Sequence, residues 1–304
     1  HLRVPGMGET TARYFRDKLA MRTRARERGI HVPDFVGAIN HDRIKRFLET
    51  VPGPWLLKPR SEASSVGIKK IFHAKDVWPI LEQLGDAVSN HLIEKMIPGE
   101  VFHVDAITWD KKIVFVEAHG YRKPLLEVVQ GGGLFSTITV ERDSPLEKDL
   151  LDCHAQILEN LGFVRGVTHT EIIRGTDGKM YFLETAARVG GVHIADLVEA
   201  STGVNLWREW ARVEVNGGDH PYAPPPTRRD YSGMIVTLAK QESPDTSAYD
   251  DPEICWRMAD NAHHVGLIVK SESRARVVEL IESYEPRVRH DFMAQLPAPK
   301  AATA

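Results

Sequence analysis

Cysteine is scarce in this chain. The 304 residues include only Cys153 and Cys255, which lie far apart and form no CxxC pattern. This scarcity argues against a disulfide framework and against a structural zinc site. Fourteen histidines are present, but no HExxH motif or comparable ligand spacing organises them. We therefore expect a protein of the reducing cytoplasm.

Long apolar runs and an excess of one charge are also lacking. No run approaches the ~20 apolar residues that a membrane span needs, and residues 1–6 lack the apolar core of a signal peptide. The net charge is −3, so no overall basic field indicates nucleic acid or an anionic membrane as a partner. With 42% hydrophobic and 27% charged residues, the composition is ordinary for a soluble globular protein, and 304 residues are enough for two or three lobes.

The pattern of short strands and helices predicts α+β lobes. Hairpins are frequent, which favours antiparallel sheets over a doubly wound parallel sheet. The expected strands are 55–58, 68–72, 91–96, 101–109, 112–118, 134–140, 167–174 and 179–185. The expected helices are 12–28, 76–88, 145–161, 192–202 and 204–214. A proline-rich linker at 221–226 then leads to a further small α/β lobe at 230–295.

A pair of glutamates on the predicted hairpin around Gly175–Gly178 is the strongest chemical signal. With a two-residue loop, Glu171 faces Glu184 directly. With a four-residue loop it faces Phe182, one same-face step away. Carboxylates roughly 5–8 Å apart repel each other unless a cation lies between them, and oxygen-only ligands are typical of Mg²⁺. An exposed sheet face with unrelated glutamates is the alternative.

Arg188 follows Glu184 by four residues and precedes Gly190 and Gly191. A guanidinium at that position could clamp a transferring phosphoryl group, and the glycines would let the backbone approach a ligand closely. A surface arginine before a helix is the alternative.

Two further segments could contact a nucleotide. Lys58 ends an apolar strand and opens the small-residue loop 60–67, which could aim N–H groups and hydroxyls at phosphates although it is not a Walker motif. The segment Glu94–Glu100 could pair an adenine through its backbone and hold ribose through a carboxylate. A surface turn and an ordinary strand end are the alternatives.

The order of these segments resembles the ATP-grasp superfamily. The segments that carry the resemblance are Arg16–Lys18, Gly29–Pro33, Leu56–Pro59, Ile93–Glu100 with Val104 and Asp105, Gly166–Glu171, Asp177–Gly178, Phe182–Glu184, Arg188–Gly191 and Thr202–Leu206. The similarity spans about residues 1–215. The stretch from Gly266 to Val288 resembles the small closing lobe of the carboxylate–amine ligases.

The resemblance implies an ATP-grasp fold, in which two α+β lobes with antiparallel sheets clasp ATP beside a small C-terminal α/β lobe. The implied ranges are 17–93 for the small lobe, 94–220 for the large lobe with the metal site, and 221–296 for the C-terminal lobe. Residues 1–16 would be the remnant of an N-terminal domain that most of these ligases carry, and 297–304 a disordered tail.

The resemblance also implies roles for matching residues. The residues expected to contact the phosphates of ATP, two of them from the lid loop, are Lys18, Lys58, Ser64 and Ser65. The residues expected to hold adenine and ribose are Glu94, Lys95 and Ile97, the last two through their backbone, and Glu100. Glu171 and Glu184 would ligate Mg²⁺, with Mn²⁺ as an alternative, and Arg188 would steady the phosphoryl group and an acyl phosphate.

Three departures from the family pattern stand out. Ala186 occupies the position of a usual asparagine, which puts a second Mg²⁺ in doubt. The lid is serine-rich where many relatives are glycine-rich. The N-terminal domain of these ligases has no counterpart before Arg16, so we expect either a truncated chain or a partner chain that supplies that domain.

The leading hypothesis is an ADP-forming ligase that joins a carboxylate to an amine. Amino acids or small peptides are the expected substrates, and the loop 119–133, with Tyr121, Arg122 and Lys123, would line the acceptor pocket. An ATP-grasp phosphotransferase or carboxylase is the second hypothesis, and a non-catalytic nucleotide-binding subunit is the third. The expected partners are small molecules, with no nucleic acid and no membrane, and a homodimer is an alternative to the partner chain.

Overall fold

A computed structural model describes residues 6–62, 67–126, 128, 133–217, 220–259 and 261–294. Within these ranges no helix is both long enough and apolar enough to cross a membrane. The chain divides into two compact units. The first unit comprises His1–Ala118, Arg142–Val189 and Trp207–Pro224, and the second comprises His119–Glu141, Gly190–Leu206 and Pro225–Ala304. The three lobes expected from the sequence stay a prediction.

Two helices open the described chain where the sequence predicted one helix at 12–28. They are α1 (Glu9–Tyr14) and α2 (Lys18–Glu27). The prediction was wrong because Asp17 is the N-cap of α2, and its carboxylate accepts hydrogen bonds from the N–H groups of Leu19 and Ala20. The same carboxylate also pairs with Arg60, which holds the start of α2 beside the end of a strand.

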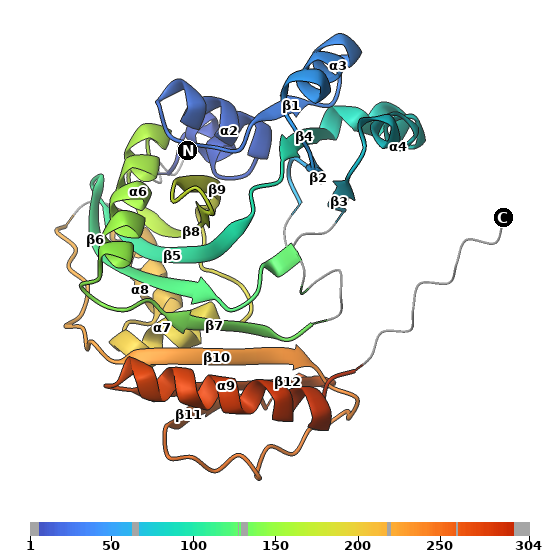
Figure 1. The fold of residues 1–304 in the computed structure, drawn as a ribbon. Helices are drawn as coiled ribbons and strands as arrows, with labels where there is room; N and C mark the ends of the chain where they lie inside the picture. Colours follow the sequence, from blue (N-terminus) through green and yellow to red (C-terminus); the bar gives the residue numbers. More distant parts are fainter. Residues whose placement is uncertain are drawn as a thin grey trace. The chain divides into compact units, whose positions relative to one another are not determined.

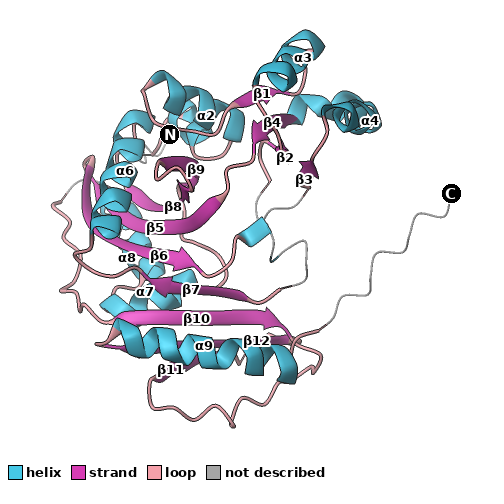
Figure 2. Cartoon of the chain, in the orientation of Figure 1, coloured by secondary structure: helices cyan, strands magenta, loops and turns pink. Residues whose placement is uncertain are grey.

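A four-stranded antiparallel sheet follows in the first unit, in the order β1-β4-β2-β3. Its strands are β1 (Phe35–Gly37), β2 (Trp55–Pro59), β3 (Lys69–Ile71) and β4 (His91–Lys95), and its helices are α3 (His41–Thr50) and α4 (Val77–Leu84). Apolar residues of both helices share one core with Trp55, Leu57 and Ile93. Figure 2 shows α3 and α4 beside these short strands.

The alternation along these strands decides what the opposite face carries. Because Leu57 and Ile93 point into the helix-covered core, their neighbours Lys58 and Glu94 lie on the other face of the sheet. Both are nevertheless buried. The sheet therefore presents a buried cation and a buried anion on the face away from α3 and α4.

The first unit also contains longer antiparallel strands. They are β5 (Gly99–Trp109), β6 (Lys112–Tyr121, whose last residues belong to the second unit), β8 (Gly166–Gly175) and β9 (Met180–Ala186). The predicted hairpin around Asp110 and Lys111 is confirmed, and both residues have the positive φ that a tight hairpin turn requires. The remaining helices of this unit are α6 (Pro145–Leu161) and α8 (Leu206–Asn216).

The second unit has a hydrophobic core of its own. Its strands are β7 (Phe135–Thr139), β10 (Tyr231–Leu238), β11 (Ile254–Arg257) and β12 (His264–Ser271), and its helices are α7 (Ile194–Thr202) and α9 (Arg274–Asp291). Strand β10 pairs with β7 and β12, and α9 packs along β10 and β12 (Figure 1). Residues 230–294 fall in this unit together with 133–141 and 190–206, and the separate small α/β lobe expected at 230–295 stays a prediction.

Helix α6 begins and ends as the sequence predicts. Ser144 accepts a hydrogen bond from the N–H of Glu147, Pro145 occupies the first turn, and Gly162 ends the helix in the left-handed conformation. The helix packs against β5 and β9 (Figure 1). Its buried face includes His154, whose ring nitrogens have no hydrogen-bond partner among the described residues.

Burial of His154 predicts an acid-sensitive contribution to stability. Desolvation lowers the pKa of His154 from its ordinary 6.5 to about 4. Between these values the unfolded chain binds more protons than the folded chain, so stability falls as the pH falls. From pH 7 to pH 5 we expect the wild-type protein to lose about 2 kcal/mol more than a His154→Leu variant, measured by urea unfolding. Equal losses in the two proteins would contradict a neutral, buried His154.

Candidate nucleotide and metal site

Glu171 and Glu184 lie directly opposite each other on β8 and β9. The turn between the strands does not achieve this alone. Beside the turn, Ile173 pairs with Tyr181 and Ile172 with Phe182, a register that would place Leu183, not Glu184, opposite Glu171. A β-bulge between Glu171 and Ile172 shifts the pairing by one residue and returns both carboxylates to one face. The sequence predicted that the two carboxylates share a face and left direct pairing and a one-step offset open. Its assumption of an even-numbered turn was wrong, and it did not predict the bulge.

Two cationic or ionisable side chains border this carboxylate pair. Lys18 Nζ lies 2.8 Å from Glu184 Oε2, and His169 Nε2 lies 3.9 Å from Glu171 Oε1. Lys18 also donates to the backbone oxygen of Glu62, 2.6 Å away. The structure therefore brings Lys18, which is far away in the sequence, to the hairpin that carries Glu171 and Glu184, and these three residues were predicted to contact phosphate and metal.

A buried network behind Glu171 was missed by the sequence reasoning. Asp105 accepts one hydrogen bond from His103 Nδ1, at 2.7 Å, and another from His169 Nδ1, at 2.8 Å. The pairing of β5 with β8 explains the geometry, because His103 lies opposite Glu171 and Asp105 lies opposite His169. The signal was present in the alternation of His103, Asp105, His169 and Glu171 along two strands.

Burial and neighbouring charges shift the pKa values of this network in opposite directions. Desolvation alone would lower the pKa of His169, but the Asp105 and Glu171 carboxylates raise it to about 10. Desolvation alone would raise the pKa of Asp105, but the two histidines hold it well below its usual range. Desolvation lowers the pKa of His103 despite its contact with Asp105. The network thus keeps an ionised carboxylate behind His169.

Glu94 and Lys58 form a buried ion pair, and Arg22 completes it. Arg22 is fully buried, and its Nη2 lies 3.0 Å from Glu94 Oε2. The sequence predicted that Lys58 and Glu94 contact different parts of ATP. The structure places them in contact with each other and adds Arg22, which no sequence motif singled out. Lys58 and Arg22 lower the pKa of Glu94 against the effect of burial, which alone would raise it.

Arg22 also reaches the hairpin that carries Glu184. Its Nη1 donates to the carbonyl oxygens of Phe182, at 3.1 Å, and of Leu183. These carbonyls flank the bulge, where ladder hydrogen bonding is locally disrupted. Arg22 therefore links the buried carboxylate of β4 to the backbone that orients Glu184.

The predicted adenine and ribose segment has partners of its own. The N–H of Lys95 donates to the backbone oxygen of Asp34, at 2.8 Å, so it already has an acceptor. Glu100 is exposed and pairs with Arg174 on β8, with 3.0 Å between Arg174 Nε and Glu100 Oε2. Ile97 lies between β4 and β5 in the turn before Gly99. The nucleotide roles of these residues stay predictions.

Arg188 follows β9 in an exposed position, and its Nη1 donates to the backbone oxygen of Val189 at 2.7 Å. Ser64 and Ser65 lie outside the described residues. Of the proposed acceptor loop, Arg122 forms ion pairs with Glu282 and Glu285 in the second unit. The roles predicted for these residues stay predictions.

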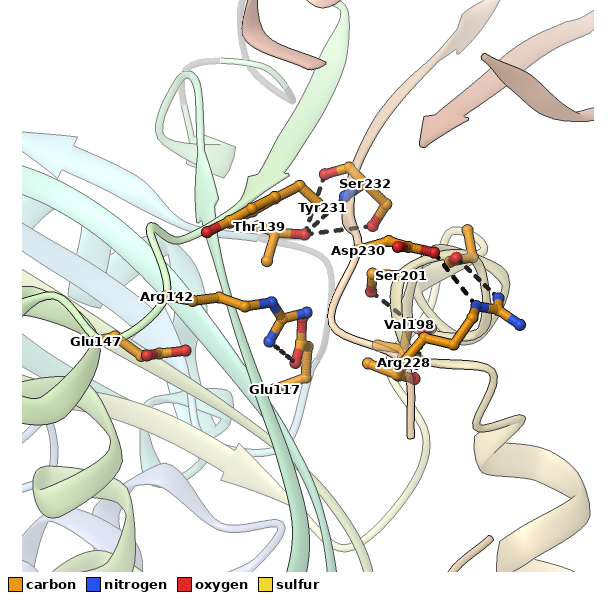
Figure 3. A network of polar contacts seen from close by, with 12 residues as sticks. Glu117, Thr139, Arg142, Glu147, Val198, Ser201, Arg228, Asp230, Tyr231 and Ser232 are labelled. Carbon is orange, nitrogen blue, oxygen red and sulfur yellow. Dashed lines mark hydrogen bonds and ion pairs between the residues drawn. The ribbon is translucent and has the colours of Figure 1, made fainter. Parts of the chain in front are cut away.

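A further, partly buried ion pair joins Arg142 to Glu117 on β6 (Figure 3). The guanidinium is bidentate, with Nη1–Oε2 and Nη2–Oε1 distances of 3.0 and 2.8 Å. Figure 3 shows the two side chains pointing toward each other. This geometry fixes the segment that leads into α6 against β6.

The residues present fit a divalent cation at the Glu171–Glu184 pair. The two carboxylates share a face, and Lys18 provides a positive charge of the kind that phosphate groups require. Lys18 and Lys58 are both held by carboxylates, so anionic phosphates could replace these contacts. The arrangement can therefore hold a cation and a polyphosphate together.

Comparison with known proteins finds a curated relative that matches more than half of the chain. An L-arginine-specific L-amino acid ligase of Bacillus subtilis is 28% identical over 221 residues, which cover 70% of this chain and 52% of the relative. The chain thus spans about half the length of that relative. No protein-family profile matches the chain.

Solved structures share the fold over almost all of the chain. An L-amino acid ligase from Bacillus licheniformis has a TM-score of 0.67 at 17% identity, covering 97% of this chain and 76% of its own. A carboxyaminoimidazole ribonucleotide synthase from Aspergillus clavatus, in complex with ATP, has a TM-score of 0.73 at 14% identity, covering 92% and 74%. These likenesses, together with the antiparallel sheets, confirm the fold predicted from the sequence.

The buried group around Glu94 predicts a large cost for one conservative change. Glu94→Gln leaves Lys58 and Arg22 buried without their anion, so we expect a loss of about 3–5 kcal/mol in the free energy of unfolding. Glu100→Gln is the matched control, since it removes an exposed pair with Arg174 and should cost less than about 1 kcal/mol. Urea unfolding of both variants checks this. Similar costs would show that Glu94 contributes no more than a surface ion pair.

Proposed function

Since this chain is a member of the ATP-grasp superfamily, we propose that it forms part of a ligase that activates a carboxylate with ATP and joins it to an amine. The observation that carries the proposal is the Glu171–Glu184 pair, opposed across β8 and β9 with Lys18 at 2.8 Å from Glu184. The ligase relatives support the same class of reaction.

Different residues of the first unit would bind the cation and the phosphates. Glu171 and Glu184 would hold a divalent cation, and when bound the cation neutralises charge on the phosphoryl oxygens. Lys18 lies beside the carboxylate pair and would exchange its contact with Glu184 for a phosphate oxygen. Lys58 would do the same from its contact with Glu94, while Arg22 remains to balance that buried carboxylate.

The proposed reaction has two steps. A substrate carboxylate oxygen attacks the γ-phosphorus, the bond from phosphorus to ADP breaks, and an acyl phosphate forms. An amine nitrogen then attacks the acyl carbon, the carbon–oxygen bond to phosphate breaks, and the nitrogen loses a proton. Arg188, which follows β9, would steady the transferred group. Charge develops on phosphoryl and acyl oxygens in both steps, so fixed cations give most of the stabilisation.

Amino acids or small peptides are the substrates we propose. The support is the likeness to L-amino acid ligases, one in sequence and one in fold. The exposed Arg122, in the loop expected to line the acceptor pocket, could pair with a substrate carboxylate after release from Glu282 and Glu285.

The test is release of ADP and phosphate by the purified chain with Mg²⁺, ATP and pairs of amino acids. A ligase releases both products only when carboxylate and amine are present together. A stable phosphorylated product would instead indicate a phosphotransferase, and bicarbonate-dependent release would indicate a carboxylase. A non-catalytic subunit would release no ADP. Its melting temperature would still rise with Mg²⁺ and a non-hydrolysable ATP analogue, since ligand at ~100 times its dissociation constant adds about 2.7 kcal/mol.

A variant that lacks one of the two proposed metal ligands should lose turnover. We expect Glu184→Gln to lower the rate of ADP release by about 100-fold or more, because the cation loses half of its carboxylate pair. Glu82→Gln, at an exposed position of α4, is the matched control and should keep the wild-type rate. Unchanged turnover in Glu184→Gln would argue against this pair as the catalytic metal site.

A further inference from the structure

The position opposite His169 lacks a side chain that could bind a cation. On the metal-bearing face, His169 of β8 pairs directly with Ala186 of β9, and the neighbouring pair is Glu171 with Glu184. Ala186 offers only a methyl group. The imidazole of His169 is therefore the one nitrogen-bearing side chain among these four residues, and it lies in the row next to the two carboxylates.

The two ring nitrogens of His169 have different surroundings. Nδ1 is bound to Asp105 at 2.8 Å, while Nε2 lies on the side of Glu171, 3.9 Å from its Oε1. Histidines that bind metals usually donate their other N–H to a carboxylate, which fixes the orientation of the ring. Asp105 is in turn fixed by His103, so the ring of His169 is held from behind.

The separation of the two facing atoms suits a shared cation. For an octahedral ion with metal–ligand distances of about 2.1 Å, adjacent donor atoms are about 3.0 Å apart and opposite donors about 4.2 Å apart. The observed 3.9 Å between His169 Nε2 and Glu171 Oε1 does not exceed the separation that two donors of one ion can have. A direct hydrogen bond between the two atoms would be shorter than this.

We infer that His169 Nε2 is a third ligand of the divalent cation held by Glu171 and Glu184, and that this nitrogen makes the site prefer Mn²⁺ or a later first-row ion over Mg²⁺. The inference rests on the proposed metal site and adds to it a ligand and a metal preference. Imidazole binds transition ions better than Mg²⁺, whereas carboxylates alone do not discriminate in this way.

The buried trio His103, Asp105 and His169 is not itself the cation site in this assignment. Its donor atoms lie within 4.8 Å of one another, which is close enough to surround a metal ion. However, Asp105 uses one oxygen for each histidine, and both contacts are made through Nδ1. The trio therefore acts as the support that aims Nε2 of His169 toward Glu171.

Pulsed electron paramagnetic resonance of Mn²⁺ bound to the whole chain with ADP tests the assignment. We expect electron spin echo modulation from a directly bound imidazole nitrogen, and the pattern should change when the histidines carry ¹⁵N. This measurement on the wild-type protein needs neither turnover nor a variant. Mn²⁺ bound without imidazole modulation would overturn the inference.

Titrations with Mn²⁺ and Mg²⁺ in the presence of ADP measure the affinity of the chain for each metal. His169→Gln should remove the nitrogen signal and weaken Mn²⁺ binding by about 10-fold or more, with a smaller effect on Mg²⁺. His73→Gln, at an exposed position, is the matched control and should change neither. Equal weakening of both metals in His169→Gln would overturn the preference.

Glu184→Gln separates this inference from the proposed function. If Glu184→Gln abolishes Mn²⁺ binding while the wild-type spectrum shows no nitrogen, the metal site stands and the role of His169 fails. If Glu184→Gln binds Mn²⁺ as tightly as the wild-type protein, the cation lies elsewhere and both fail.

Discussion

The buried guanidinium of Arg22 connects the parts of the first unit on which the proposed site depends. One edge of Arg22 binds the Glu94 carboxylate, which also holds Lys58. Another nitrogen binds the carbonyl oxygens of Phe182 and Leu183 at the bulge of β9. A planar group with several fixed donors can do this, whereas the single ammonium of a lysine could not reach both the carboxylate and the carbonyls. The contact with Glu94 offsets part of the cost of burying this charge, and the carbonyl oxygens accept hydrogen bonds from a further nitrogen of the guanidinium.

Helix α2 and the segment that follows it also provide partners for the irregular backbone of β9. Besides Arg22, Met21 Sδ accepts a contact from the N–H of Thr185 at 3.4 Å, and the backbone oxygen of His31 accepts from the N–H of Phe182 at 2.9 Å. Polar backbone groups that a bulge removes from the ladder must find other partners. The position of Glu184 thus depends on residues that are more than 150 positions away in the chain.

The sequence predicted the elements that local patterns determine. The hairpin at Asp110 and Lys111 and the helix capped by Ser144 require only their own residues and neighbours, and both were confirmed. The break at Asp17 was missed because an apolar and basic run concealed a side chain that caps a helix. The contacts between charged residues that are far apart in the sequence were harder to predict. Arg22 looks like one of many arginines in a basic helix, and only the packing of β4 and β9 around it reveals its burial.

The site residues likewise differ in whether a local pattern or a long-range contact positions them. The facing of Glu171 and Glu184 was predicted from alternation, although the bulge that achieves it depends on tertiary contacts. The network of His103, Asp105 and His169 requires the register between β5 and β8, which joins strands separated by about 60 residues and leaves no short-range signal.

The bulge on β9 also has a consequence for how this hairpin can change over evolution. An odd register at the turn and an extra residue at the bulge each reverse the face on which Glu184 lies, and together they cancel. A single insertion or deletion in either place would turn the carboxylate to the opposite side of the sheet. Length changes in this hairpin should therefore persist only in compensating pairs, so that the parity of the whole loop, rather than its length, is what selection preserves.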